Sequence, residues 1–128
     1  GFLALNRNKR SIAINLKNPA GRETFYQLVR GADILVENNR PGVTARLKID
    51  WPTLREINPR LIYASISGFG QTGPWASRPG FDLIAQAMSG ILSGTGHPGQ
   101  PPVKNSVPAA DLGSGLLAVY AILSAVIG

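Results

Sequence analysis

The 128-residue chain contains no cysteine and only one histidine, His97. Without cysteine, these residues can form no disulfide, no thiolate zinc site and no cysteine nucleophile. One histidine cannot build a multi-histidine metal site within one chain, so we expect no metal. Aromatic residues make up 7% of the sequence, and few of them lie among the basic residues. Stacking on nucleic-acid bases is therefore not favoured.

Acidic residues are missing from the start of the chain, although the net charge of the whole is +6. Before Glu23 the only charged side chains are Arg7, Lys9, Arg10, Lys17 and Arg22. A basic segment of this kind is typical of a partner that is a nucleic acid, a membrane surface or a phosphorylated small molecule. A solvated, solubilising face explains the same charges equally well. From the scarcity of aromatic residues we expect no nucleic-acid partner.

Targeting signals and a long apolar run are also lacking. No signal-peptide pattern opens the chain, and the C-terminal apolar run falls short of the roughly 20 residues that span a bilayer. With 44% hydrophobic and 16% charged residues, the composition is that of a globular protein with one core. We therefore expect a soluble cytoplasmic protein with no membrane partner.

Strand and helix patterns alternate along the chain. Apolar periodicity and turn residues predict strands at 11–15, 33–37 and 61–67. Helices are predicted at 19–30, 43–47, 51–57 and around 81–92, with a last apolar helix beginning near Asp111. Strand 33–37 is of the compact apolar type that is buried on both faces, and residues 1–4 carry no signal for helix or strand. This order predicts an α/β fold with a parallel sheet.

In such sheets ligands bind beyond the carboxyl ends of the strands. Those ends lead into three connections that carry amides, hydroxyls and cations, namely 15–17, 38–40 and 67–68. Glu37 ends a strand there, and we expect its carboxylate to accept hydrogen bonds from loop amides. The glycine-rich loop 68–74 matches neither a P-loop nor a dinucleotide fingerprint. The loop could cover a ligand or be a mobile surface turn, and the sequence leaves both interpretations open.

Asp111 precedes the last apolar helix, where aspartate is commonly an N-cap. Gly113 and Gly115 follow, and each glycine costs on the order of 1 kcal/mol in a helix relative to alanine. Small residues at this point would let a bulky ligand approach the carboxylate closely. The helix dipole favours the ionised carboxylate, which is a usable nucleophile toward an activated acyl group. From these residues alone, Asp111 could be either a helix N-cap or a nucleophile.

Ordered segments over nearly the whole chain resemble the class III CoA-transferases, the group of formyl-CoA transferase and carnitine CoA-transferase that also contains the α-methylacyl-CoA racemases. The matching residues are Asn8 to Ile12, Leu16-Lys17, Gly21, Ala32 to Asn38, Pro41-Gly42, Asn58 to Ile62, Ser65, Gly68 to Gly70, Gly73-Pro74, Phe81-Asp82, Gln86, Ala110-Asp111 and Gly115. The resemblance implies a parallel-sheet, Rossmann-like fragment of the large domain that ends in an apolar helix. Residues 1–128 would be a partial N-terminal portion of that domain, truncated at both ends, from an interlocked homodimer.

The resemblance also implies a function and a site. Asp111 would be the nucleophile that moves CoA between carboxylic acids through an aspartyl anhydride and an aspartyl-CoA thioester. The substrates would be acyl-CoA and a carboxylic acid, with no metal. The implied CoA contacts are Ile14, Asn15, Leu16, Lys17, Asn38, Asn39, Arg40, Arg46, Ser67, Arg78 and Phe81.

Phe81 separates the branches of this family, because the racemases have a histidine at its position. Phenylalanine cannot transfer a proton, so transfer is favoured over racemisation. A racemase-type isomerase stays an alternative if a base outside this chain faces Asp111. A catalytically incomplete fragment, acting only as an anion-binding or structural module, is the alternative of another class.

Overall fold

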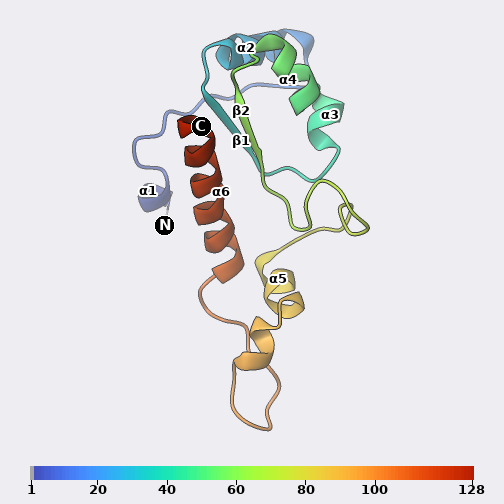
Figure 1. The fold of residues 1–128 in the computed structure, drawn as a ribbon, viewed down its shortest axis with the longest axis vertical. Coiled ribbons are helices and arrows are strands. Elements are labelled where there is room, and N and C mark those ends of the chain that lie inside the picture. The colour runs from blue at the N-terminus through green and yellow to red at the C-terminus, as the bar shows by residue number, and fades with distance from the viewer. Residues whose placement is uncertain (1) are drawn as a thin grey trace.

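A computed structural model describes residues 2–128 of the chain. The elements in order are α1 (Phe2–Leu5), α2 (Pro19–Arg30), β1 (Ile34–Glu37), α3 (Val43–Leu47), α4 (Trp51–Ile57), β2 (Ile62–Ser65), α5 (Asp82–Met88), the 3-10 helix η1 (Ile91–Gly94) and α6 (Ala109–Ile127). The molecule is elongated, with the strands and α2 to α4 at one end and α5 with the following loop at the other (Figure 1). The predicted α/β class with a parallel sheet is confirmed.

The sheet has two strands in the described part of the chain, and β1 pairs with β2 in parallel. The predicted strand at 11–15 is wrong, because this segment takes no part in the sheet. It runs instead along the start of α2, where a Cβ on Gly21 would collide with the carbonyl oxygen of Asn15. Alternating polarity predicted a strand here but could not supply the partner strand that a sheet requires.

The core lies between one face of the sheet and the helices beside it. Its buried side chains are Val29, Ile49, Leu54 and Leu61. Leu35 of β1 and Tyr63 of β2 face this cluster. On the other face, Ile34 is 39% and Val36 is 55% exposed, although α6 contacts β2. The prediction that β1 is buried on both faces is therefore wrong for this chain, because only its α2–α4 side is covered.

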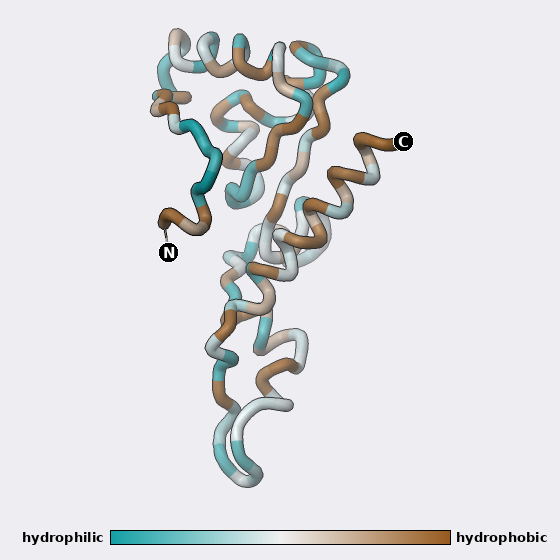
Figure 2. The backbone as a smooth tube through the Cα atoms, turned by 90° about the vertical axis from the view of Figure 1, so that its left-hand side faces the viewer, coloured by the Kyte–Doolittle hydropathy of each residue, from teal (hydrophilic) through white to brown (hydrophobic). Residues whose placement is uncertain are grey.

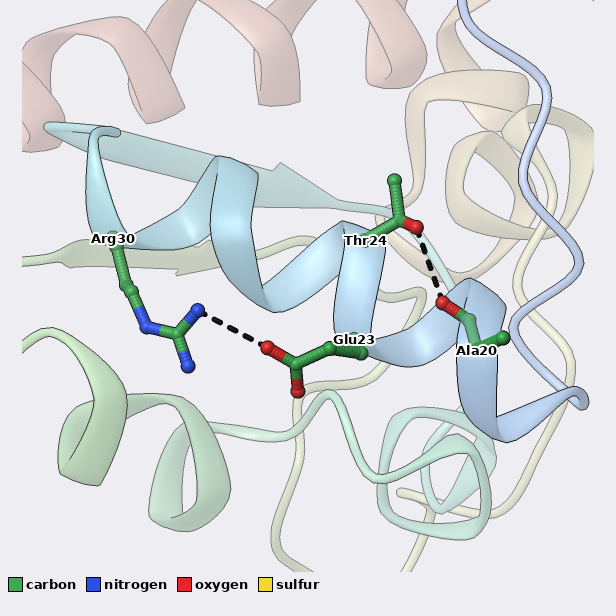
Figure 3. A network of polar contacts seen from close by, with 4 residues as sticks. All are labelled: Ala20, Glu23, Thr24 and Arg30. Carbon is green, nitrogen blue, oxygen red and sulfur yellow. Dashed lines mark hydrogen bonds and ion pairs between the residues drawn. The ribbon is translucent and has the colours of Figure 1, made fainter.

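Helix α2 begins and ends as its sequence predicts. Asn18 is the N-cap and accepts a 2.9 Å hydrogen bond from the Ala20 amide, and Pro19 is the first helical residue. On the exposed side of α2, Arg30 pairs with Glu23 at 3.2 Å and Thr24 Oγ1 donates to the Ala20 carbonyl (Figure 3). An exposed pair of this kind adds little stability. Capping and packing therefore position α2.

The predicted helix around 81–92 is two elements in the structure. Helix α5 ends at Met88, and η1 begins at Ile91. Between them Gly90 has φ +84°, a left-handed conformation that breaks a right-handed helix. The short helix α1 is a further difference, since its residues gave no helix signal.

Helix α6 begins at Ala109, and Asp111 is its third residue. The prediction of Asp111 as N-cap is therefore wrong: Pro108 occupies that position and makes no side-chain capping bond. The helix is predominantly apolar along its length (Figure 2). With 19 residues it is long and apolar enough to cross a membrane by those two criteria, which the sequence-based count did not anticipate. The helix extends further than the apolar run, because it includes the alanines before Asp111.

Candidate active site at the carboxyl ends of the strands

Glu37 connects the two strand ends to the loops that follow them. Its carboxylate accepts a 2.7 Å hydrogen bond from the Asn39 amide and another from the Ser65 hydroxyl of the neighbouring strand. Ser65 Oγ in turn accepts a 2.7 Å bond from Gln71 Nε2 in the glycine-rich loop. The expectation that Glu37 bonds a loop amide is confirmed. The network ties the 38–40 connection and the glycine-rich loop to the sheet edge.

Two adjoining cavities lie beyond this edge and share Asp111. The first has a volume of about 310 Å³ and the second about 330 Å³. Both are lined by Asn38, Ser67, Gly68, Gly80, Phe81, Asp82 and Asp111. The first continues along α6 past Ser114 and Gly115, whereas the second continues past Asn39, Arg40 and Arg78. Asp111 thus lies between a cavity that continues along the small residues of α6 and one that two guanidinium groups line.

The glycine-rich loop is closed by a contact between two glycine backbones. A Cβ added to Gly68 would collide with the Cα of Gly80, and one added to Gly80 would collide with Gly68. Phe69 of the loop meets Trp75, just after it, edge to face at 5.7 Å between ring centroids, and Arg78 lies 5.0 Å over Trp75. The loop therefore packs on its own side chains, and Arg78 is held on the cavity wall.

Ser67 lines both cavities and carries a hydroxyl group. Within residues 2–128, its hydroxyl oxygen is buried and has no hydrogen-bond partner. A buried, unsatisfied donor or acceptor costs about 1–3 kcal/mol. A ligand that hydrogen-bonds Ser67 Oγ would remove that cost.

The first turn of α6 is held by a side chain from α5. Asp82 Oδ1 accepts hydrogen bonds from the backbone amides of Ala110 at 2.9 Å and Asp111 at 3.4 Å. Its other oxygen accepts a 2.6 Å bond from Gln86, which is fully buried. Sequence reasoning gave these two residues no role. The available signal was two polar residues four apart on an otherwise apolar helix face.

Not every implied CoA contact reaches these cavities. Asn38, Asn39, Arg40, Ser67, Arg78 and Phe81 line at least one of them, together with Asp111. The cavity linings lack Ile14, Asn15, Leu16, Lys17 and Arg46. Leu16 packs against the core, Asn15 accepts from the Lys17 amide at 3.1 Å, and Arg46 is exposed on α3. In residues 2–128, no three His, Cys, Asp or Glu side chains are grouped to hold a metal ion.

Tyr63 lies on the core side of β2, and its hydroxyl donates to the Ile49 carbonyl at 3.2 Å. Burial raises the pKa of Tyr63 above its ordinary 10.0, and the nearby charges of Glu37 and Asp50 act in the same direction. A hydrogen bond with Thr44 partly offsets this rise in the pKa. Tyr63 is therefore a neutral packing group under ordinary conditions and supplies no base to the cavities.

Fold and site together define an α/β protein that has a carboxylate-bearing cavity at the carboxyl ends of parallel strands. The family model described as CoA-transferase family III matches residues 1–128. This chain belongs to that family, as its resemblance predicted.

The relatives agree with this assignment. The chain is 50% identical over 125 residues to the acetyl-CoA:oxalate CoA-transferase of Acetobacter aceti, covering 97% of this chain and 32% of that protein. It is 48% identical over 126 residues to the succinate–glutarate CoA-transferase of Agrobacterium fabrum, covering 98% and 32% respectively. Among solved structures, a CaiB/BaiF family protein from Brucella suis matches with a TM-score of 0.92 at 46% identity, over 95% of this chain and 32% of that one. The chain thus spans about a third of the length of these relatives.

Proposed function

We propose that this chain is part of an enzyme that transfers CoA between two carboxylic acids, with Asp111 as the nucleophile. The observation that carries the proposal is the position of Asp111, which lines both cavities at the start of α6. Relatives at 48% and 50% identity are named as CoA-transferases, which supports the same class of reaction.

The proposed chemistry begins with an Asp111 carboxylate oxygen attacking the carbonyl carbon of an acyl-CoA thioester. The carbon–sulfur bond breaks, CoA leaves as a thiolate, and a mixed anhydride forms on Asp111. The thiolate then attacks the Asp111 carbonyl carbon, which releases the donor carboxylate and leaves an aspartyl-CoA thioester. An acceptor carboxylate reverses the two steps, so that the new acyl-CoA leaves and the Asp111 carboxylate is regenerated.

The surroundings of Asp111 suit this role. Asp111 lies in the first turn of α6, where the partial positive charge of the helix N-terminus attracts anionic groups. A Cβ on Gly115 would meet no atom within 4 Å, so the helix surface beside Asp111 leaves room for a thioester. Arg40 and Arg78 on the second cavity can pair with phosphate oxygens, for which guanidinium groups are well shaped.

The CoA contacts divide into two groups under this proposal. Asn38, Asn39, Arg40, Ser67, Arg78 and Phe81 lie with Asp111 and would hold the pantetheine arm, with Arg40 and Arg78 at the phosphates where that arm begins. Lys17 and Arg46 are exposed outside the cavities and would meet the nucleotide phosphates farther away.

Phe81 bears on the racemase alternative. Its side chain lines both cavities beside Asp111 and carries no ionisable group. Proton transfer would therefore need a second base from outside this chain, whereas acyl transfer needs only the Asp111 carboxylate. The proposal accordingly favours transfer.

Replacing Asp111 with asparagine in the full-length protein tests the proposal. We expect CoA transfer to fall by on the order of 10⁴-fold or more, because the amide is a poor nucleophile. Affinity for CoA should stay nearly unchanged, since the side chain keeps its size. Mass spectrometry of the wild-type protein mixed with acyl-CoA should find an adduct on the peptide that contains Asp111.

Asp33→Asn is the matched control, because this exposed aspartate lies before β1 and away from both cavities. It should keep full activity. Normal turnover by the Asp111→Asn protein would reject the nucleophile. Racemisation of a 2-methylacyl-CoA without transfer would instead favour the isomerase.

A further inference from the structure

Helix α5 buries two polar side chains that face the start of α6. Asp82 is 9% exposed and Gln86 is fully buried. A buried carboxylate is costly unless hydrogen bonds replace its lost water. Both Asp82 oxygens are satisfied, one by the Ala110 and Asp111 amides and the other by Gln86. The group is therefore held in one orientation.

Gln86 fixes that orientation because both ends of its amide are engaged. Its Nε2 donates to Asp82 at 2.6 Å, and its Oε1 accepts from the Asn105 amide at 3.1 Å. Rotating the amide by 180° would oppose donor to donor at Asn105 and acceptor to acceptor at Asp82. The pair thus connects α5 both to the segment before α6 and to the first turn of that helix.

Helix α6 depends on this contact for its N-terminal capping. Pro108 at the N-cap makes no side-chain capping bond, so the first backbone amides lack a local acceptor. Asp82 provides that acceptor from another helix, and its charge is favourable at a helix N-terminus. One of the two bound amides belongs to Asp111 itself. A shift of the Asp82 carboxylate would therefore move the backbone that carries the Asp111 side chain.

We propose that Asp82 and Gln86 are a positioning pair that fixes the Asp111 carboxylate for attack on the thioester. The assignment rests on the proposed CoA transfer. Asp82 also lines both cavities, but Gln86 and the α6 amides engage its two carboxylate oxygens. It therefore acts on Asp111 through the α6 backbone, as a positioning residue. Displacing a reacting group by about 1 Å can reduce a rate by about a hundredfold.

Asp82→Asn in the full-length protein makes the pair incompatible. The new NH₂ group must face either the Nε2 of Gln86 or the α6 amides, and all of these are donors. Gln86→Glu places a second carboxylate against Asp82 and repels it. In the double variant, the NH₂ group introduced at position 82 can donate to the carboxylate introduced at position 86, while the amide oxygen at position 82 still accepts from the α6 amides. The swap therefore restores the bonds between the pair, to the α6 amides and to the Asn105 amide. It loses only the long 3.5 Å bond from Gln86 Nε2 to the Val107 carbonyl.

The measurement is the single-turnover rate of adduct formation on Asp111 at saturating acyl-CoA, taken per folded protein, with the dissociation constant of acyl-CoA and the Tm recorded alongside. Each single variant should lower the rate by up to about a hundredfold while the dissociation constant changes little. The double variant should recover most of the loss. Ser89→Ala is the control, because it removes a 3.3 Å hydrogen bond to the Gln86 carbonyl on the same helix and leaves both side chains in place. It should keep the wild-type rate.

A purely structural role predicts a different result. Single variants with lower Tm but an undiminished rate per folded protein would overturn the proposal, and so would a double variant no faster than the slower single one. If Asp82→Asn does not accumulate as folded protein, Gln86→Met decides, because it removes every side-chain hydrogen bond of Gln86 and leaves the Asp82 charge. An unchanged adduct rate in that variant would overturn the pair.

Failure of the proposed function gives a separate outcome. No adduct on Asp111 in the wild-type protein counts against the nucleophile. Amide hydrogen exchange at Ala110 and Asp111 then still tests the positioning. It should accelerate in Gln86→Met and remain slow in Ser89→Ala, and equal exchange in both variants would overturn the positioning role.

Discussion

At the scale of single residues, Gly68 shows how one missing side chain shapes the site. Its backbone lies against that of Gly80, so that a Cβ on Gly68 would be 2.8 Å from Gly80 N and closer still to its Cα. Backbone cannot yield as the end of a flexible side chain can. The contact closes the glycine-rich loop at its base, beside Asp111.

We therefore expect Gly68→Ala to push the backbone at position 68 away from Gly80. This should destabilise the full-length protein by about 1–3 kcal/mol. Gly113→Ala is the matched control, because a Cβ there would meet nothing within 4 Å and the position is helical. It should stabilise the protein by up to about 1 kcal/mol. Denaturant unfolding of both variants measures the difference. Equal stability of the two would contradict the close contact.

The residue scale also limits what sequence can predict. Asp111 was singled out from its neighbours, because glycine and an apolar helix are visible along the chain. Asp82 was not, because its partners at Ala110 and Asp111 lie 28 and 29 residues away. The i, i+4 spacing of Asp82 and Gln86 is visible along the chain, but it does not show which distant amides Asp82 bonds.

At the scale of elements, an asparagine side chain binds the backbone at each end of α2. Asn18 acts as an acceptor and Asn58 as a donor. At the start, Asn18 Oδ1 accepts from the Ala20 amide. At the other end, Asn58 Nδ2 donates to the carbonyls of Val29 at 2.9 Å and Ala32 at 2.8 Å. The first contact is a local cap. The second joins α2 to the end of α4 across the core.

The same substitution should therefore have opposite consequences at the two positions. Asn18→Asp keeps the acceptor and adds a charge that suits a helix N-terminus, so stability should hold or rise slightly. Asn58→Asp places a carboxylate against two carbonyl oxygens and should cost more than about 2 kcal/mol at neutral pH.

The pH dependence checks the cause of this loss. The repulsion would raise the folded-state pKa of the carboxyl introduced at position 58, so the variant should regain stability as pH falls and that group becomes protonated. Urea unfolding at neutral and acidic pH measures this, with Asn18→Asp as the reference. A loss independent of pH would point to packing alone.

The boundaries of the helices that cover the core were predictable from the sequence. The ranges of α3 and α4 match their predictions, since caps, turns and apolar periodicity are local. The strand predicted at 11–15 failed for the opposite reason. Pairing needs a partner, and β1 pairs with β2.

At the scale of the whole molecule, the chain leaves a long apolar surface uncovered. Leu116, Val119 and Leu123 on α6 are 63%, 53% and 52% exposed. The chain spans about a third of the length of its relatives. We expect the remainder of the full-length protein to cover α6.

The double substitution Leu116→Lys with Leu123→Lys should then improve the behaviour of the isolated chain but destabilise the full-length protein. In the isolated 128-residue chain it should reduce self-association and dye binding, because it breaks an exposed apolar face. In the full-length protein it should cost more than about 3 kcal/mol, because each lysine would be buried. Sedimentation of the chain and thermal unfolding of the full-length protein measure the two effects.

An unchanged Tm in the full-length protein would show that α6 stays exposed there. Recovery of that protein in the membrane fraction, and its release by the double substitution, would assign α6 to a bilayer. Glu56→Lys on α4 is the control, because this exposed residue gains the same charge away from α6. It should leave both measurements unchanged.

The sequence by itself determined the α/β class, the helices α2 to α4, the two strands of the sheet and the family. It also pointed to Asp111 and to Glu37 as a partner of loop amides. These features depend on neighbours within a few residues or on ordered motifs along the chain.

Only the tertiary structure decided how Asp111 is held and which polar residues share its cavities. It separated Arg40 and Arg78 from Lys17 and Arg46, and it showed Asp82 capping α6 from another helix. The physical reason is that burial and hydrogen bonding act through space. They join segments whose separation along the chain gives no periodic signal.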